Sequence, residues 1–181
     1  MHLSRLKPRW GIGLGSLLLL LGGVAHSADS TLAPDVQLPT SQGQIRLQDL
    51  RGQVVLVDFW ASWCGPCRQS FPWMNDMQAR YGEQGLKILA INVDAEREEA
   101  ERFLRDLPAR FTVAFDPQGQ SPERFGVMGM PSAYLIDRDG RIHRQHIGFH
   151  PDRAQGYEDE IRALLTQNGA SATSARTGET P

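Results

Sequence analysis

Two nearly continuous apolar runs dominate the middle of the chain and predict strands that are buried on both faces. They cover Gln53–Trp60 and Leu86–Val93, and both are rich in β-branched residues. Shorter strand patterns lie at Ile45–Leu47, Phe111–Phe115, Ala133–Ile136 and Ile142–Ile147. An Asp-Arg-Asp-Gly turn joins the last two as a predicted hairpin. Residues 29–40 are polar and interrupted by proline, so we expect an extended lead-in there.

Helical periodicity separates these strands. After Cys67, apolar residues recur at a spacing of three or four through Phe71, Met74, Met77 and Tyr81, and the pattern ends near Gly82. Further helices are predicted at Glu96–Leu107, near Pro122–Phe125 and at Pro151–Gln167. Strands that alternate with helices predict an α/β domain with a mixed sheet and helices on both faces.

The N-terminal pattern is that of a targeting segment. Basic residues precede a 16-residue apolar run, Trp10–Ala25, and small residues follow it. At 1.5 Å per residue this run spans about 24 Å, short of the roughly 30 Å hydrocarbon core of a membrane. We therefore expect residues 1–27 to be a signal peptide, with an uncleaved membrane anchor as the alternative. Either outcome predicts an extracytoplasmic domain over residues 28–168, and the Ser/Thr/Gly/Ala-rich residues 169–181 predict a disordered tail.

Chain length and charge bear on the number of domains and on nucleic-acid binding. The chain has 181 residues, enough for one ordinary globular domain. Its only charges within residues 1–27 are three basic side chains, so the remainder carries 16 basic and 21 acidic side chains, a balance of −5. A basic face for nucleic acid is therefore not expected. We expect a monomer.

The two cysteines, Cys64 and Cys67, are three positions apart in Trp-Cys-Gly-Pro-Cys. The first follows a buried strand and the second opens a helix, so the Cys64 sulfur is predicted to lie among unsatisfied amides, where a thiolate is stabilised. Two cysteines are too few for a tetrathiolate zinc site. A structural disulfide is disfavoured because closing so short a loop removes only about 1.9 kcal/mol of chain entropy. The pattern favours a dithiol that cycles to a disulfide, with no metal and no other cofactor.

The stretch from Val57 to Cys67 resembles a thioredoxin-family active site, and residues 34–167 resemble the TlpA/ResA-type secreted thiol-disulfide oxidoreductases. The resemblance implies a thioredoxin-like fold with extra N-terminal strands and a central helical insertion. It also implies that Cys64 attacks the substrate and Cys67 resolves the mixed disulfide. Met130-Pro131 matches the family's cis-proline loop, which guides a substrate segment together with Trp63, Gly65 and Pro66. An ordinary trans turn at Pro131 and a core position for Trp63 are the alternatives, and we expect partial exposure of Trp63.

Asp58 is a carboxylic acid inside an otherwise apolar strand. Burying it charged would cost several kcal/mol, so its pKa is expected to be raised. It matches the buried acid of thioredoxin and is a candidate proton acceptor for Cys67. The alternative is a hydrated, incidental carboxylate at a strand edge.

One position departs from the family pattern. The TlpA/ResA type often carries Glu three residues after the second cysteine, where this chain has Ser70. Acid-base work would then depend on Asp58 or water, and membership of the cytochrome-maturation subgroup is put in question. His143, His146 and His150 invite a metal site, but the first two are expected to point to opposite faces of a strand.

The leading interpretation is a periplasmic or otherwise extracytoplasmic enzyme that reduces protein disulfides through Cys64 and Cys67, for example in cytochrome c maturation. The resemblance implies a membrane thiol-electron transporter as the electron source. A disulfide oxidant or isomerase is the enzyme alternative. A copper chaperone on a thioredoxin scaffold is the binding alternative, although it lacks a persuasive histidine ligand.

Overall fold

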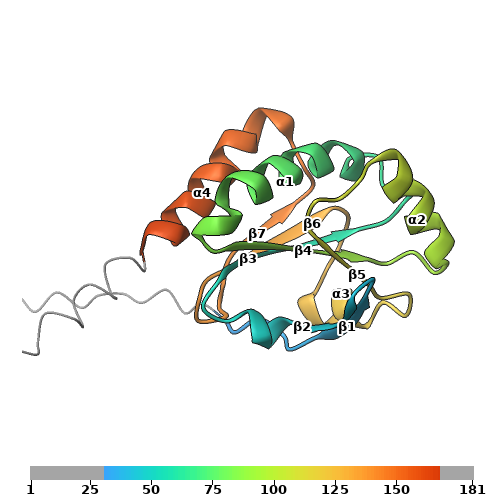
Figure 1. The fold of residues 1–181 in the computed structure, drawn as a ribbon, viewed down its shortest axis with the longest axis horizontal. Helices are drawn as coiled ribbons and strands as arrows, with labels where there is room; N and C mark the ends of the chain where they lie inside the picture. Colours follow the sequence, from blue (N-terminus) through green and yellow to red (C-terminus); the bar gives the residue numbers. More distant parts are fainter. Residues whose placement is uncertain (1–30, 168–181) are drawn as a thin grey trace, which may run out of the picture.

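The two long apolar runs form the centre of a seven-stranded mixed sheet. The structure is a computed structural model that describes residues 31–167. β3 (Val54–Trp60) and β4 (Leu86–Asn92) pair in parallel along their whole length. The other strands are β1 (Gln37–Thr40), β2 (Gly43–Arg46), β5 (Thr112–Phe115), β6 (Ser132–Ile136) and β7 (Ile142–Ile147). Their spatial order is β2-β1-β5-β4-β3-β6-β7, with β6 antiparallel to β3 (Figure 1).

Helices cover both faces of this sheet, as the alternation of strands and helices predicted. The α-helices are α1 (Cys67–Tyr81), α2 (Arg97–Asp106), α3 (Gln120–Phe125) and α4 (Ala154–Gln167), with short 3-10 helices at Leu47–Leu50, Gly82–Gln84 and Pro151–Arg153. Figure 1 shows α1 and α4 over one face and α3 on the opposite side. This is the expected thioredoxin-like fold, with α2 as the helical insertion between β4 and β5.

Side chains of β3 alternate between two hydrophobic cores. Leu56 and Trp60 pack in the core beneath α1 and α4, whereas Val57 and Phe59 pack in the core that contains Phe125 of α3. Asp58 shares the parity of Leu56 and Trp60, which places it on the α1 and α4 side. The strand alternation therefore aims this carboxyl group at the face where the cysteine helix lies.

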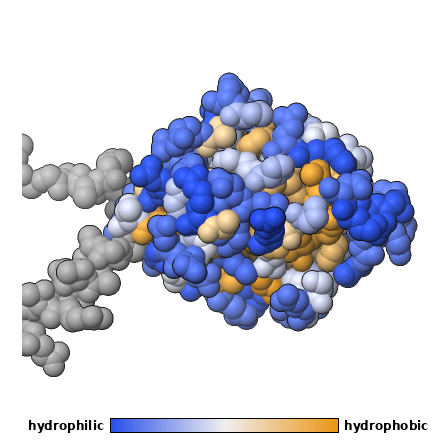
Figure 2. All heavy atoms as spheres, turned by 45° about the horizontal axis from the view of Figure 1, so that its top comes forward, coloured by the Kyte–Doolittle hydropathy of each residue, from blue (hydrophilic) through white to orange (hydrophobic). Residues whose placement is uncertain are grey.

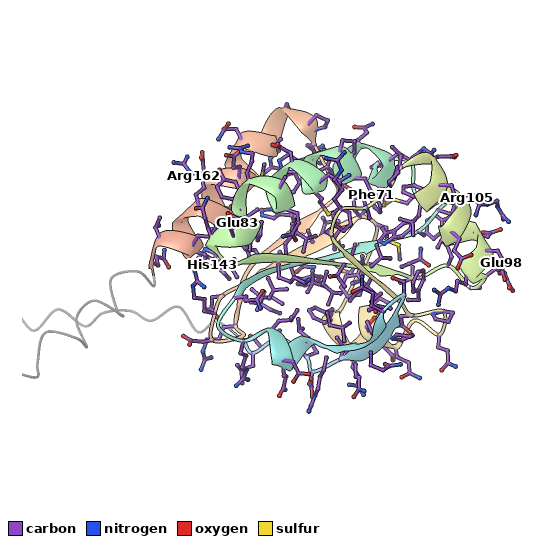
Figure 3. All side chains as sticks on the ribbon, in the orientation of Figure 1. Phe71, Glu83, Glu98, Arg105, His143 and Arg162 are labelled. Atoms are coloured by element: carbon purple, nitrogen blue, oxygen red, sulfur yellow. A yellow bond between two sulfur atoms is a disulfide. The ribbon has the colours of Figure 1, made fainter. Side chains whose placement is uncertain are left out.

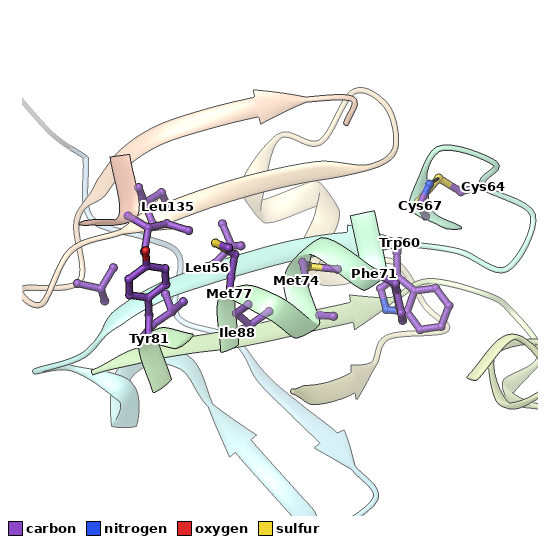
Figure 4. Packing of buried hydrophobic residues seen from close by; sticks show 14 of the residues in the cluster. Leu56, Trp60, Cys64, Cys67, Phe71, Met74, Met77, Tyr81, Ile88 and Leu135 are labelled. Carbon is purple, nitrogen blue, oxygen red and sulfur yellow. Dashed lines mark hydrogen bonds between the residues drawn. A yellow bond between two sulfur atoms is a disulfide. The ribbon is translucent and has the colours of Figure 1, made fainter. Parts of the chain in front are cut away.

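An aromatic cluster fixes the first turns of α1. The Phe71 ring lies 4.9 Å from both the Trp60 and the Phe103 ring centroids, and Figure 4 shows Phe71 beside Trp60 near the cysteines. Edge-to-face pairs of this kind add about 0.5–1.5 kcal/mol beyond area burial. Figure 3 shows Glu98 and Arg105 of α2 pointing away from the domain, while Phe71 points inward.

The face of the molecule in Figure 2 is mainly hydrophilic, with apolar residues gathered toward its right side.

The N-terminal strands differ from the expectation. The predicted lead-in over residues 29–40 contains β1, which pairs with β2 and, through Thr40, with β5. β1 forms despite Pro39 and makes a hairpin with β2, in whose turn the Thr40 hydroxyl donates to the Gly43 carbonyl oxygen at 2.9 Å. The expected strand at Ile45–Leu47 is shifted, since β2 ends at Arg46 and Leu47 begins a 3-10 helix.

Three further expectations concern the ends of the chain. The signal peptide at 1–27 and the tail at 169–181 lie outside the described residues, so they and the exact bounds of the 28–168 domain stay predictions. Within residues 31–167, the longest helices are too short or too polar to cross a membrane.

An ion pair between exposed Arg80 of α1 and buried Glu158 of α4 joins the two helices and carries a testable share of the stability. Glu158 of α4 is 8% exposed and accepts hydrogen bonds from Arg80 and from the Tyr81 hydroxyl. The Arg80 guanidinium, followed by the Tyr81 hydroxyl, holds the pKa of Glu158 below its ordinary value. We expect Glu158→Gln to lower the free energy of unfolding at neutral pH by about 1.5–3 kcal/mol, the range for hydrogen bonds to charged groups.

The pH dependence of this effect follows from the sign of the pKa shift. A lowered pKa in the folded state stabilises the fold above the ordinary value of 4.5, and this contribution is lost as the pH falls through the folded-state pKa. Urea unfolding of both proteins at a series of pH values is the measurement. The exposed Asp159→Asn is the matched control, and a difference that persisted unchanged into acid would contradict the explanation.

Candidate active site

The two cysteines form a disulfide in the loop that leads from β3 into α1. Their Cα atoms lie 5.4 Å apart, and Cys64 is 4% exposed against 0% for Cys67. The helix begins at Cys67, because the amides of Arg68 and Gln69 bond back to the carbonyls of Gly65 and Pro66. Cys64 is therefore the sulfur nearer to solvent, which suits the attacking role that the resemblance implies for it.

The sulfur of Cys64 lies at the N-terminus of α1. The backbone amide of Cys67 donates a hydrogen bond to Cys64 Sγ at 3.3 Å. Free amides and the positive end of the helix dipole both stabilise negative charge at this place. When the disulfide is reduced, these groups favour a thiolate on Cys64, which is the reactive form of a cysteine.

Asp94 anchors the loop that carries the motif, and the sequence reasoning missed it. Its carboxylate is 3% exposed and accepts hydrogen bonds from the Ser62 amide at 2.9 Å, the Ser62 hydroxyl at 3.0 Å and the Asn92 side chain at 2.8 Å. Asn92 is the last residue of β4, and Asp94 lies two positions beyond it. Polar residues at the carboxyl end of a parallel strand were the available signal, since the ends of neighbouring parallel strands meet at one edge.

The residues around the sulfurs are open to solvent. Trp63 is 69% exposed, which agrees with the expected exposure and excludes a core position. Gly65 and Pro66, between the cysteines, are also exposed. An apolar surface beside a nearly buried disulfide suits contact with another polypeptide.

The Met130–Pro131 peptide bond is cis, as the resemblance implied. The Pro131 carbonyl oxygen accepts a hydrogen bond from the Gly148 amide at 2.8 Å, and the Ser132 hydroxyl donates to the Gly129 carbonyl at 2.7 Å. These bonds tie the loop to the residue that directly follows β7 and to itself. Met130 packs against the core cluster that also contains both cysteines, so the loop and the disulfide rest on one body of side chains.

Asp58 is buried, and its surroundings are those of a neutral acid. The residue is 3% exposed, and burial raises its pKa to about 8. Its Oδ2 atom has no hydrogen-bond partner within residues 31–167. Asp58 lines a cavity together with Ser70 and Pro131. The expectation of a raised pKa agrees with this structure, and the alternative of a hydrated strand-edge carboxylate does not.

Ser70 occupies the position where the family often has glutamate. It is buried, and its hydroxyl donates to the Cys67 carbonyl oxygen at 3.1 Å. This short side chain bonds within its own helix and leaves Asp58 as the titratable residue of this part of the cavity. The structure therefore brings Asp58, Ser70 and Pro131 together beneath the start of α1.

Two of the histidines considered for a metal lie on β7 in different surroundings. His143 is exposed on β7, while His146 Nε2 lies 2.7 Å from a Glu160 carboxylate oxygen. Across residues 31–167, no group of three side chains from histidine, cysteine, aspartate and glutamate comes together as a metal ion requires.

Comparison with known proteins agrees with this geometry. The AhpC/TSA family matches residues 30–145. The thiol-disulfide oxidoreductase ResA of Geobacillus thermodenitrificans is 34% identical over 139 residues, covering 70% of this chain and 80% of the relative. ResA of Bacillus thuringiensis subsp. konkukian is 33% identical over 111 residues, covering 61% of this chain and 64% of the relative, so that match spans less than two thirds of the relative's length.

A solved structure supports the same family relationship. The crystal structure of a candidate thiol:disulfide interchange protein DsbE from Chlorobium tepidum has a TM-score of 0.74 and 53% sequence identity, and the match covers 75% of this chain and 96% of the other. The fold, the sequence similarity and the position of the cysteine pair all indicate the same family. The chain belongs to the AhpC/TSA family, and within it to the relatives of the ResA thiol-disulfide oxidoreductases.

Proposed function

We propose that this protein is a thiol-disulfide oxidoreductase that reduces protein disulfides outside the cytoplasm. The observation that carries the proposal is the Cys64–Cys67 disulfide at the start of α1, with the Cys67 amide bonded to Cys64 Sγ. The names of the ResA relatives and of the DsbE structure support the same reaction class. The signal-like residues 1–27 support the location.

The first step is attack on the substrate. In the reduced protein, the Cys64 thiolate attacks one sulfur of a substrate disulfide, and a new bond joins Cys64 to that sulfur while the other leaves as a thiolate. The exposed side of the motif, with Trp63, Gly65 and Pro66, receives the substrate. The loop at Met130 and Pro131 holds a substrate segment extended by backbone hydrogen bonding, as the resemblance implies.

The second step releases the product. Asp58 takes the proton of the Cys67 thiol, through water in the cavity that it lines with Ser70, and the Cys67 thiolate attacks Cys64 Sγ. The protein disulfide forms and the substrate leaves as its second thiolate. With a pKa of about 8, roughly a tenth of Asp58 is ionised at neutral pH, and this fraction is a strong enough base to accept a thiol proton, which an ordinary aspartate is not.

Each turnover oxidises the protein, so two electrons must return to it. We propose that a membrane thiol-electron transporter supplies them, as in proteins of the resembling type. Cytochrome c maturation is one setting in which such a reductant acts. Ser70 stands where the resembling type often has glutamate, so substrate trapping is the test of whether this protein acts in that setting.

The direction of the reaction is testable through the reduction potential. The Gly65-Pro66 pair matches the reducing thioredoxin type and offers no side chain that strongly stabilises the Cys64 thiolate. We expect a midpoint nearer to the roughly −270 mV of thioredoxin than to the roughly −120 mV of the oxidant DsbA. Equilibration of the purified domain in glutathione buffers measures it. A midpoint above about −180 mV would support the oxidant or isomerase alternative instead.

An insulin-reduction assay alongside a copper(I) titration separates the enzyme from the copper chaperone. The proposal predicts catalytic reduction of insulin that is lost in Cys64→Ser. Copper binding by the dithiol with no insulin reduction would replace the enzyme with the binding protein.

A further inference from the structure

Asp58 shares a cross-strand row with a residue at the edge of the sheet. Asp58 of β3 is opposite Ala133 of β6, and Ala133 is opposite His146 of β7. Residues directly opposite in antiparallel pairs project to the same face of a sheet. Two strand spacings separate Asp58 from His146, or roughly 9–10 Å between backbones. The small side chain of Ala133 leaves the space between them unfilled.

The cavity at the candidate active site occupies this space. It has a volume of about 30 Å³ and is lined by Asp58, Ala133 and His146 as well as by Ser70. A water molecule needs about 10–15 Å³ measured in this way, so the cavity has room for about two. Asp58 Oδ2, which lacks a hydrogen-bond partner among the described residues, is a polar group that such water would satisfy.

The far end of the cavity reaches solvent through an acid-base pair. His146 Nε2 lies 2.7 Å from Glu160 Oε2, and their side chains are 18% and 28% exposed. The titratable lining residues are Asp58, His146, Tyr157 and Glu160. Arg144 is the charged group beside them, with its Nε atom 3.5 Å from Glu160. α1 lines the cavity with Ser70, Trp73 and Met74, none of which is charged.

We propose that His146, held by Glu160, passes protons between solvent and Asp58 through water in this cavity. The inference rests on the proposed dithiol function and adds the route by which the buried acid exchanges its proton. Imidazole changes charge near neutral pH, which suits it to this exchange. His146 acts through Asp58 and is a positioning residue for proton transfer, since it touches neither sulfur nor substrate.

The proton balance fixes when the relay is needed. During the second step, Asp58 gains the proton of Cys67, the Cys67–Cys64 bond forms and the Cys64–substrate bond breaks. Asp58 can accept this proton only when it is ionised, so it must lose its own proton before the second step and the Cys67 proton after it. Each proton passes to water, then to the imidazole of His146, and leaves the imidazole for solvent. No electrons move in the relay.

Two-phase reaction with dithiobis(nitrobenzoate) tests this without the natural substrate. The reduced protein releases one nitrothiophenolate when Cys64 attacks and a second when Cys67 displaces the mixed disulfide, and both are followed by absorbance in one stopped-flow trace. The full chain is compared as wild type, His146→Gln, Asp58→Asn and the double variant. His143→Gln, an exposed histidine on the same strand, is the matched control.

We expect His146→Gln to slow the second release about tenfold around neutral pH, less than the roughly 10²–10⁴-fold loss of a group that itself transfers the reacting proton, because His146 acts through Asp58. The first release and the His143→Gln protein should be unchanged. Added imidazole should restore part of the rate, and the double variant should be no slower than Asp58→Asn, because residues that act as a unit are not additive.

Three outcomes would overturn the relay. Equal second-release rates in His146→Gln and His143→Gln would show that the histidine transfers no proton to this site. Losses that multiply in the double variant, without imidazole rescue, would indicate a structural effect. Release of only one equivalent by the wild type would instead reject the dithiol function on which the relay rests.

Discussion

Cys67→Ser is expected to turn a transient mixed disulfide into a stable product joined through Cys64. The two sulfurs are bonded in the structure, so the resolving thiol needs no rearrangement of the fold to reach Cys64. Such intramolecular attack has a very high effective concentration. Without it, release depends on external thiols, and we expect it to be slower by at least about 10³-fold. Expression in the native compartment, followed by mass spectrometry of the trapped species, measures the effect and identifies substrates.

The reciprocal variant is the control for this trapping. Cys64→Ser leaves Cys67, which is 0% exposed, as the lone thiol, and we expect no mixed disulfide above the background of the double serine variant. Comparable adducts through Cys67 would show that the burial order in the structure does not set the order of reaction. Absence of adducts in Cys67→Ser, with Cys64 fully reduced, would contradict the assigned roles.

Asp58→Asn is expected to raise the free energy of unfolding, by an amount that grows with pH. The folded chain holds the Asp58 proton up to a pKa of about 8, whereas the unfolded chain releases it near 3.8. Between these values the folded state binds more protons, so wild-type stability is lost as the pH rises. At about 1.4 kcal/mol per pKa unit, the upper limit of the loss is roughly 6 kcal/mol.

Asparagine has nearly the same shape and carries no such penalty. The difference in unfolding free energy between variant and wild type should therefore be small near pH 4 and reach several kcal/mol around pH 8. Urea unfolding of the oxidised proteins across this range measures it. A difference that is flat with pH would show that Asp58 is not the group that titrates in the folded state.

The same variant separates the two chemical steps. Because the carboxylate serves Cys67, Asp58→Asn should slow release of the mixed disulfide about 10²-fold and leave attack by Cys64 much less affected. Equal slowing of both steps would reject the assigned role.

The sequence was sufficient for the parts that depend on local pattern. Continuous apolar runs predicted β3 and β4 as central strands, and the strand-to-helix junction placed Cys64 at the start of α1. Asp58 could be identified as a candidate because a lone carboxyl group in an apolar strand is costly to bury in its charged form. β1 escaped prediction, since its strand form depends on pairing with β2 and β5 and its own composition does not favour it.

Contacts that depend on long-range strand register could not be predicted from the sequence. Asp94 holds Ser62 across 32 positions of sequence, and no local pattern links them. The row of Asp58, Ala133 and His146 requires two cross-strand registers at once, and a shift of one residue in either would turn His146 to the other face. The cavity could not be predicted either, because it forms where side chains from several elements leave a space unfilled.

The central claim is that Cys64 and Cys67 act together as a two-electron reductant of disulfides. A single-turnover reaction of the reduced protein with a disulfide-bonded peptide tests it most directly, with thiols counted and products weighed by intact mass. The account predicts that each chain loses two thiols, gains the Cys64–Cys67 disulfide and releases one fully reduced peptide. Peptide that stays attached to the wild-type protein, or remains oxidised while both cysteines stay reduced, would contradict it.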